Sequence, residues 1–199
     1  GVCTMREFLD AVQYGDYDYD FIYQIPTEED DAANAYRVYR LEGYLFPDTY
    51  DFYVGEGSSS AIGRFLRNSQ KKYAELIDDC NSTGYTLDDI ITLASIIQEE
   101  VGYVSEMGKV SSVLHNRLAS DEYPKLQCDA TVFYLENSVK PYVSEERYTE
   151  LAELYSTYKC EGIPEGPITN PGLEAISAAL NPENTPYYFF ISDSENVYH

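Results

Sequence analysis

Basic residues are scarce in this sequence. Its 199 residues include 13 Lys and Arg against 35 Asp and Glu, which gives a formal net charge of −22 at pH 7. Proteins that bind nucleic acid or anionic lipid surfaces use Lys and Arg side chains to displace counterions from phosphate groups. The charge balance therefore excludes nucleic acid and anionic membrane surfaces as partners.

Residues that bind metals are also few. The chain has two His and four Cys, and no two of the cysteines form a CxxC pair. Structural zinc sites take Cys and His ligands at short, paired spacings. The sequence therefore predicts no metal site, and nothing in it implies a cofactor. The even number of cysteines leaves free thiols and several disulfide pairings as alternatives.

Long apolar runs are absent as well. No segment approaches the ~20 apolar residues that a membrane-spanning helix requires, and no basic-then-apolar leader opens the chain. The first residues, Gly1-Val2-Cys3, do not resemble a native start. We therefore expect the chain to be a piece of a longer protein, with any signal or membrane anchor outside it.

The residues that are present favour one globular core. Hydrophobic residues make up 44% of the chain, and a chain of this length supports one substantial core, or one catalytic domain with a small appendage. Tyrosine is abundant, with 21 residues, whereas Trp is absent. Tyr rings could line a sugar-binding groove, but Tyr is also common in strands and on surfaces, so the count alone decides nothing.

Glu100 is the most informative single residue. Residues 87–101 have the apolar spacing of a helix, and at ~100° per residue Glu100 falls within the apolar stripe while Glu99 falls on the polar side. The stripe is formed by Ile90, Leu93, Ile97 and Val101. A carboxyl group in apolar surroundings loses hydration, so its pKa rises toward the range where it can act as a general acid. The alternative is that the helix end frays and the side chain turns into water.

Helices, loops and short strands are expected elsewhere. Helices are predicted at residues 4–12, 60–78 and 105–119, and from Asn170-Pro171 to before Pro182, with Thr86 and Asp89 capping the helix that carries Glu100. The acidic segment 14–36 is predicted to be a loop with one helical turn. Residues 41–55 are predicted to be loop and edge strand, residues 131–135 are β-prone, and residues 187–192 are predicted to be a buried strand.

Polar residues gather in irregular segments of the kind that often carry binding sites. They are Asn116 and Arg117 at a helix end, Gln127, Asp129 and Thr131 at alternate positions of an extended segment, and Tyr155, Tyr158 and Asn170 among turns. For each of them alone, the simpler interpretation is a turn residue that bonds its own backbone. Together they favour a binding site.

Six segments, in order along the chain, resemble blocks of the YceG-like family, the MltG-type endolytic murein transglycosylases. The resemblance extends from about residue 4 to the C-terminus. The segments are LEGYLFPDTYDF (41–52), LASIIQEE (93–100), VSSVLHNRL (110–118), LQCDATVFY (126–134), YSTYKCEGIPEGPITNPG (155–172) and AALNPENTPYYFFIS (178–192).

The resemblance implies that Glu100 is the catalytic residue, because it matches the second Glu of the family's ASI-I/V-E-K-E block. Gln98 stands where the family has the first Glu of that block. The chain also differs from the usual family residues at Cys128, Ala130 and Ser156. It ends at His199, where the family continues into another strand and a tail.

The implied reaction is cleavage of the β-1,4 bond between N-acetylmuramic acid and N-acetylglucosamine in peptidoglycan strands. One carboxyl group suffices, because the C6 hydroxyl of the muramyl residue closes onto C1 as a 1,6-anhydro ring and water is not a reactant. Substrate contacts are expected from Glu42, Tyr44, Asn116, Gln127, Asp129, Thr131, Tyr158 and Asn170.

The expected fold is α+β, with helices carrying Glu100 packed on a small sheet that includes residues 187–192. Residues 1–55 are expected to be a lead-in that follows a missing LysM-like subdomain, and residues 56–199 a catalytic domain with a truncated tail. The resemblance also implies a full-length protein anchored on the extracytoplasmic face of the bacterial membrane, with cell-wall synthases as candidate partners.

Two other functions stay open. A hydrolytic muramidase would use Asp129 as its second carboxylate and release a reducing muramic acid. A non-enzymatic peptidoglycan-binding or scaffold protein would keep the fold with an inactive site. The replacement of the usual Glu by Gln98 favours this alternative. If the segments around Cys128 and Cys160 both approach Glu100, a disulfide between them could join two walls of the cleft.

Overall fold

The computed structural model describes residues 1–26, 37–192 and 197–198, and the regular secondary structure of these residues is almost entirely helical. The longer helices are α1 (Met5–Tyr14), α2 (Ser58–Tyr73), α3 (Leu76–Thr83), α4 (Leu87–Glu100), α5 (Val104–Leu118), α6 (Asp129–Tyr134), α7 (Glu145–Tyr155) and α8 (Leu173–Leu180). Short 3-10 turns are η1 (Asp20–Gln24) and η4 (Lys140–Tyr142), and η3 (Leu135–Val139) is a π-helical turn.

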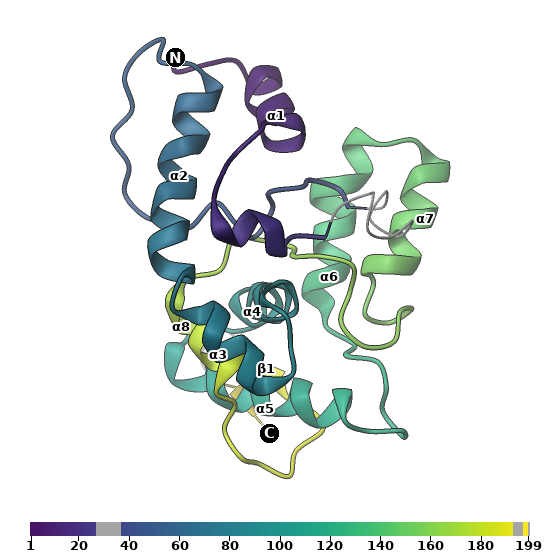
Figure 1. Ribbon diagram of the computed structural model, residues 1–199. Coiled ribbons are helices and arrows are strands. Elements are labelled where there is room, and N and C mark those ends of the chain that lie inside the picture. Colours follow the sequence, from purple (N-terminus) through teal and green to yellow (C-terminus); the bar gives the residue numbers. More distant parts are fainter. Residues whose placement is uncertain (27–36, 193–196, 199) are drawn as a thin grey trace.

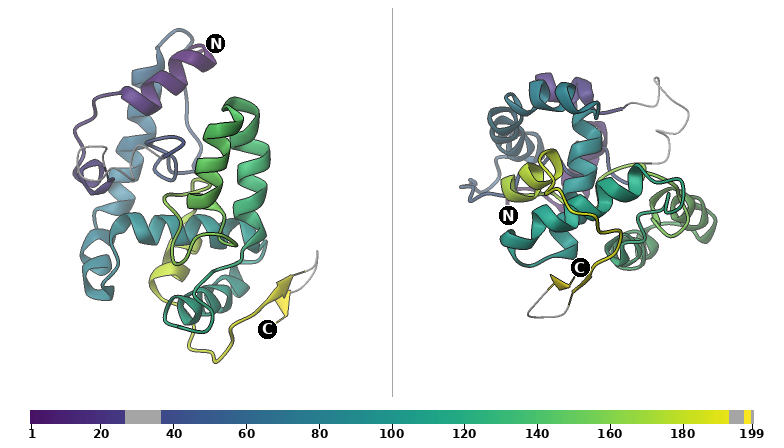
Figure 2. Two further views of the ribbon diagram at one scale, coloured as in Figure 1. Left: turned by 90° about the vertical axis from the view of Figure 1, so that its right-hand side faces the viewer. Right: turned by 90° about the horizontal axis from the view of Figure 1, so that it is seen from below.

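The prediction of an α+β fold is wrong. Among the described residues, extended pairing is confined to β1 (Ile191–Ser192) and β2 (Val197–Tyr198), which pair antiparallel with Ile191 opposite Tyr198. These strands lie at the edge of the molecule and support no helix layer (Figure 2). No strand forms in 41–55 or 131–135. The core is therefore built by helices packing on helices.

Helix α4 runs through the centre of the molecule (Figure 1) and contacts α3, α5, α6 and α8. It begins at Leu87 because the Thr86 hydroxyl accepts the Asp89 N–H while the Asp89 carboxylate accepts the Thr86 N–H, as predicted. From Leu87 to Ile97 all residues except Asp89 are buried, which is typical of a helix enclosed on every side. The helix ends at Glu100, where the core meets the surface.

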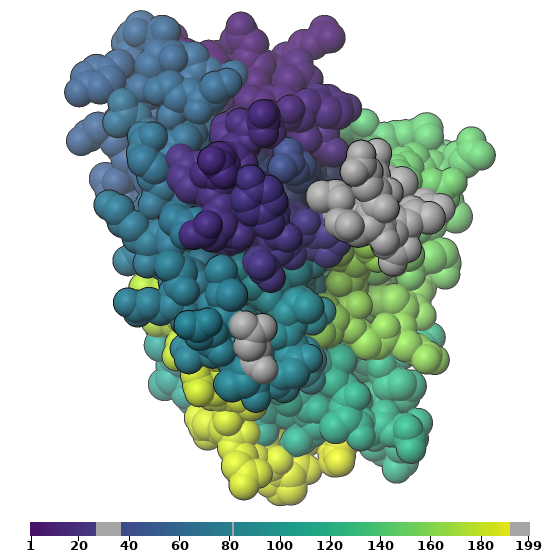
Figure 3. Space-filling view, viewed as in Figure 1, coloured from purple at the N-terminus to yellow at the C-terminus, as the bar shows by residue number. Residues whose placement is uncertain are grey.

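The N-terminal residues belong to the same core. The predicted capping box at Thr4 starts α1, which contacts α2, and the N-terminal residues lie directly against α2 in the space-filling view (Figure 3). The fully buried Phe21 stacks on Tyr44, with ring centroids 5.8 Å apart, and meets Tyr73 of α2 edge-on. The predicted segment 1–55 thus shares its packing with the helices that follow it.

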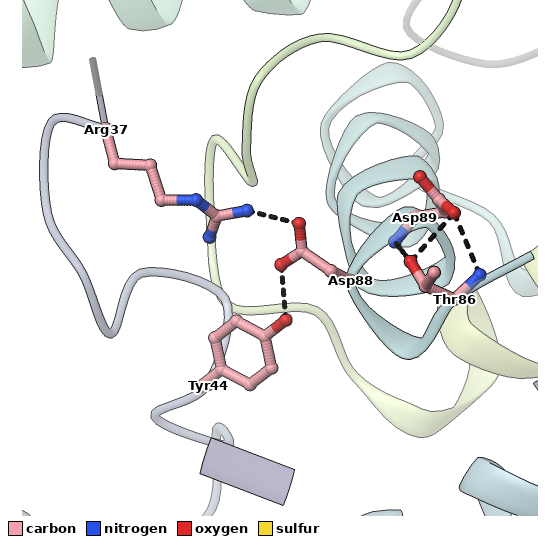
Figure 4. A network of polar contacts seen from close by, with 5 residues as sticks. All are labelled: Arg37, Tyr44, Thr86, Asp88 and Asp89. Atoms are coloured by element: carbon pink, nitrogen blue, oxygen red, sulfur yellow. Dashed lines mark hydrogen bonds and ion pairs between the residues drawn. The ribbon is translucent and has the colours of Figure 1, made fainter. Parts of the chain in front are cut away.

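A buried ion pair joins the segment before α2 to α4. Arg37 donates to one oxygen of Asp88, and the Tyr44 hydroxyl donates to the other oxygen at 2.5 Å (Figure 4). Burial raises the pKa of Asp88, while Arg37 and Tyr44 oppose the rise. All three residues are buried, so the network fixes the Arg37–Tyr44 segment against the central helix.

Residues 131–135 form helix rather than strand because tertiary contacts outweigh their β-propensity. The fully buried Thr131 hydroxyl donates to the Cys128 carbonyl, and Tyr134 packs its ring against Tyr155 of α7. Helix α6 continues through η3 and η4, and this continuous helical segment runs beside α7 (Figures 1 and 2).

The predicted strand at 187–192 is mostly exposed coil. The Asn116 amide donates to the carbonyls of Thr185 and Tyr187, and Arg117 donates to the carbonyl of Tyr188. Side chains of α5 therefore supply hydrogen bonds to backbone carbonyls that would otherwise bond to a neighbouring strand. The prediction of a buried strand is wrong for these residues, apart from the short β1.

Two predicted helices have different bounds. The helix expected at 60–78 is divided into α2 and α3. Helix α3 ends at Thr83, and its C-cap Gly84 has the left-handed conformation. Helix α8 begins at Leu173 rather than at Pro171. Its expected N-cap, Asn170, instead accepts a hydrogen bond from the Leu45 N–H at 2.9 Å.

The four cysteines are free thiols, so the disulfide suggested between Cys128 and Cys160 is not formed. Of the two, Cys128 is buried and Cys160 is half-buried. Within the described ranges, no helix is both long and apolar enough to cross a bilayer.

Candidate active site

The Glu100 side chain lies at the C-terminal end of α4, half-buried at the edge of the core. Its carboxylate accepts the N–H of Ala130, the second residue of α6, at 3.0 Å. Burial raises the pKa of Glu100, the Ala130 N–H opposes the rise, and the charge of Asp129 adds to it. The predicted direction of the shift is confirmed, and its main cause is desolvation.

A cavity of about 360 Å³ opens beside Glu100. Its walls come from α4, α5, the start of α6, the turn after α7 and the segment that precedes β1. The lining residues are Glu100, Val113, Arg117, Leu126, Gln127, Asp129, Tyr158, Tyr188, Phe189, Phe190 and Ile191. The cavity therefore combines one half-buried acid with polar groups and exposed aromatic rings.

Three predicted substrate-binding residues line this cavity with Glu100. Asp129 accepts a hydrogen bond from the Tyr158 hydroxyl at 2.7 Å, which joins the two predicted segments across the wall. Gln127 is exposed and has a left-handed φ of 56°. Non-glycine residues rarely adopt this conformation, and it is often found at functional sites.

Beneath the cavity, Thr157 links the segment that carries Gln127 and Asp129 to the segment that carries Tyr158. Its hydroxyl accepts the N–H of Cys128 at 2.8 Å, and its carbonyl accepts the N–H of Gln127 at 3.0 Å. Thr131, a predicted substrate contact, is fully buried, and its hydroxyl accepts the Thr157 N–H at 3.2 Å. Thr131 therefore lies beneath the wall and does not reach the cavity.

Arg117 was among the polar residues that favoured a binding site but was not an expected substrate contact. It lines the cavity and is only 4% exposed. It donates to the carbonyl of Lys125 at 2.7 Å, to that of Tyr188 at 2.9 Å, and to the side chain of Gln127. Its guanidinium also lies 5.1 Å from the centre of the Phe189 ring. Arg117 thus joins the wall that carries Gln127 to the wall that carries the aromatic residues.

The sequence contained a signal for Arg117. It follows Met107, Val110 and Leu114 at helical spacing, so it lies on the buried stripe of α5, as Glu100 does on α4. Tyr188 and Phe189 were missed for a different reason. They were assigned to a buried strand, but they are 38% and 58% exposed.

Four other predicted substrate contacts lie outside the cavity. Tyr44 is fully buried and bonds Asp88. Asn116 holds the carbonyls of Thr185 and Tyr187, and Asn170 holds the N–H of Leu45. Glu42 accepts the Tyr134 hydroxyl at 2.5 Å. All four have intramolecular partners that position neighbouring segments.

Burial raises the pKa of Glu42 to about 7 from its ordinary value of 4.5, and the Tyr134 hydrogen bond opposes the rise. The folded state therefore binds a proton on Glu42 more tightly than the unfolded state. The contribution of the protonated Glu42 to the stability of the fold is complete below about pH 4.5 and is lost as pH rises through 7. We expect Glu42→Gln to match the parent near pH 4 and to be more stable by about 3 kcal/mol at pH 8.

Urea unfolding of the parent and of Glu42→Gln at several pH values measures this difference. Glu146→Gln on α7 is the control, because Glu146 is exposed. A free-energy difference between parent and Glu42→Gln that stays constant from pH 4 to pH 8 would contradict the assigned burial of a protonated Glu42.

Within the described part of the chain, no group of three His, Cys, Asp or Glu side chains could hold a metal ion. The chemistry that the cavity itself offers is proton transfer by Glu100, together with hydrogen bonding from Gln127, Asp129 and Tyr158 and stacking on Tyr188 or Phe189.

Comparisons with known proteins identify relatives of this chain. The sequence model of the YceG-like family matches residues 3–199. Over 169 residues, covering 84% of the chain, the sequence is 34% identical to the endolytic murein transglycosylase of Bacillus subtilis strain 168. It is 26% identical over 196 residues, or 96% of the chain, to the enzyme of the same name from Streptococcus pneumoniae serotype 2 strain D39.

A crystal structure of a YceG-like protein from Listeria monocytogenes superposes with a TM-score of 0.76 at 28% identity and covers 98% of this chain. The chain spans 46% of the Bacillus relative, 35% of the Streptococcus relative and 63% of the Listeria chain. The match to the family extends over nearly all of the sequence and is supported by both sequence and fold. The chain therefore belongs to the YceG-like family.

Proposed function

We propose that this chain is the catalytic part of an endolytic peptidoglycan lytic transglycosylase, which cleaves the β-1,4 bond between N-acetylmuramic acid and N-acetylglucosamine. The observation that carries the proposal is the half-buried Glu100, whose pKa is raised by burial at the wall of an open cavity. The names of the relatives support the same substrate class.

Glu100 acts first as general acid and then as general base. The protonated carboxyl gives its proton to the glycosidic oxygen as the bond from C1 to that oxygen breaks. The resulting carboxylate takes the proton of the muramyl C6 hydroxyl while O6 bonds to C1, which forms the 1,6-anhydro ring and regenerates the acid. The Ala130 N–H, which bonds the carboxylate at 3.0 Å, stabilises the charged form between the two steps.

The other cavity residues position the sugar. Gln127, Asp129 and Tyr158 supply hydrogen bonds to hydroxyl and N-acetyl groups, and the rings of Tyr188 and Phe189 supply apolar faces. Arg117 positions both walls through its bonds to backbone carbonyls. The remaining expected contacts support the site indirectly, through the intramolecular hydrogen bonds described above. They are Glu42, Tyr44, Asn116, Thr131 and Asn170.

The wider setting follows from the same proposal. Residues 1–55 form a lead-in and residues 56–199 the catalytic domain of a longer protein that is anchored on the extracytoplasmic face of the bacterial membrane. Its substrate is the peptidoglycan strand, and cell-wall synthases are its candidate partners.

Asp129 is the one residue that favours a second candidate, a hydrolytic muramidase, because its carboxylate lines the same cavity. In the transglycosylase the Asp129 side chain orients the wall by accepting the Tyr158 hydroxyl. The other alternative, an inactive scaffold, receives no support from Gln98, because this residue has a structural role. The side-chain oxygen of Gln98 accepts the N–H of Gly172 at 3.1 Å and so anchors the start of α8.

Asp129→Asn separates the two enzymatic candidates. The variant keeps the oxygen that accepts the Tyr158 hydroxyl, so we expect its rate of glycan cleavage to stay within about tenfold of the parent. A hydrolase that needs Asp129 to activate water would lose about 10²–10⁴-fold. Chromatographic analysis of cleaved, purified glycan strands over time gives both rates, and a loss in the second range would contradict the single-carboxylate mechanism.

A further inference from the structure

A second cavity, of about 270 Å³, is lined by residues next in sequence to those of the first. It lies along α6 and the turn that follows it, and it is also bordered by the end of α4 and by the segment before α8. Its lining includes Glu99, Ala130, Phe133, Asn137, Ser138 and Thr169. None of these residues was among the expected catalytic or substrate-binding residues, and the proposed function assigns no role to their side chains.

The linings of the two cavities contain consecutive residues beside the Glu100 carboxylate. Glu99 lines the second cavity and Glu100 the first, while Asp129 lines the first and Ala130 the second. The Glu100 carboxylate accepts the Ala130 N–H, so the acid lines the first cavity and directly contacts a residue that lines the second. A polymer that passes the carboxylate from one side to the other would contact both cavities.

The lining of the second cavity suits a sugar. Phe133 is 62% exposed, and an exposed ring offers an apolar face to the C–H groups of a pyranose. Asn137 and Ser138 are exposed and Thr169 is half-buried, and they offer an amide and two hydroxyls to sugar hydroxyl and N-acetyl groups. An aromatic face beside a few polar groups is typical of small-molecule sites.

Asn137 and Ser138 lie in the π-helical turn η3. Such turns are rare and often occur at functional sites, because they insert a residue and re-aim the side chains. Here Leu135 and Val139 at the two ends stay buried, while Glu136, Asn137 and Ser138 are exposed. The turn therefore holds its apolar ends in the core and presents polar side chains at the cavity.

We propose that the second cavity binds the part of the glycan strand that lies on the other side of the scissile bond from the first cavity. This inference rests on the proposed function. A strand that is cut at an internal position has sugars on both sides of the broken bond. The Glu100 carboxylate lines one cavity and bonds Ala130, which lines the other. Phe133 stacks on a sugar ring, and Asn137 bonds its substituents.

The test uses Phe133→Ala and Asn137→Ala in the complete 199-residue chain. Tyr142→Ala is the matched control, because Tyr142 is also an exposed aromatic residue, at 69%, and lies outside both cavities. Two quantities are measured with purified glycan strands many disaccharides long. They are kcat/KM for cleavage, and the Kd for strands bound by the same variants made in a Glu100→Gln background.

We expect Phe133→Ala to lower kcat/KM about tenfold and to raise Kd by a similar factor, as for truncation of an important interface residue. Asn137→Ala should have a smaller effect in the same direction, and Tyr142→Ala none. If the parent binds and cleaves strands but Phe133→Ala behaves like Tyr142→Ala in both assays, the second subsite is overturned and the proposed function stands. If the parent neither binds nor cleaves, both are overturned.

Discussion

Glu100→Gln should lower the rate of glycan cleavage by about 10²–10⁴-fold or more, because it removes the group that transfers the proton in both steps. The amide keeps the size of the carboxyl and retains an oxygen that can accept the Ala130 N–H, which now bonds Glu100 at 3.0 Å. The fold should therefore be unchanged. Cleavage is measured with purified glycan strands, and folding by circular dichroism and urea unfolding.

Glu146→Gln is the matched control for the loss of a carboxylate, since Glu146 is exposed on α7 and lines neither cavity. It should cleave at the parent rate. Near-full activity in Glu100→Gln, together with an inactive Asp129→Asn, would move the catalytic role from Glu100 to Asp129 and contradict the mechanism.

Asp88→Asn should have the largest effect on stability. It leaves the Arg37 guanidinium buried without its counter-charge, and breaking one side of a buried ion pair costs about 3–5 kcal/mol. Arg37 is 7% exposed and Asp88 is 8% exposed, so water cannot replace the lost partner without opening the core. The change is measured as the free energy of unfolding in urea.

Asp89→Asn provides the comparison, because Asp89 is the next residue and has a different role (Figure 4). Its carboxylate accepts the N–H and hydroxyl of Thr86 in the capping box, and loss of such a cap costs about 1 kcal/mol. Tyr44→Phe should cost a similar amount, since it removes one hydrogen bond to Asp88. Equal losses for Asp88→Asn and Asp89→Asn would show that the buried ion pair does not stabilise the fold as inferred.

Local sequence patterns predicted the central helix and its acid well. The Thr86 capping box and the apolar spacing of α4 depend on residues within one helix. Such local patterns are recognised directly from the spacing of residues in the sequence. The same argument placed Glu99 in solvent and Glu100 against the core, and the structure agrees. Sequence alone was sufficient here because the apolar face of α4 determines both the exposure of Glu99 and the burial of Glu100.

Contacts between distant segments could not be predicted in this way. TVFYL at 131–135 has β-prone residues, but the hydroxyl of Thr131 and the ring of Tyr134 find partners in a helix packed beside α7. The backbone of 185–188 is bonded by Asn116 and Arg117 from α5. These long-range bonds explain why the α+β prediction failed and why Tyr188 and Phe189 were not recognised as cavity residues.

Mass spectrometry of the products formed from purified glycan strands tests the central claim most directly. An enzyme in which Glu100 acts as acid and base produces strands that end in 1,6-anhydro-N-acetylmuramic acid, without incorporation of oxygen from ¹⁸O-labelled water. We expect these anhydro ends from the parent chain and none from Glu100→Gln. Reducing muramic acid ends that carry ¹⁸O, or the absence of any cleavage by the parent, would contradict the account.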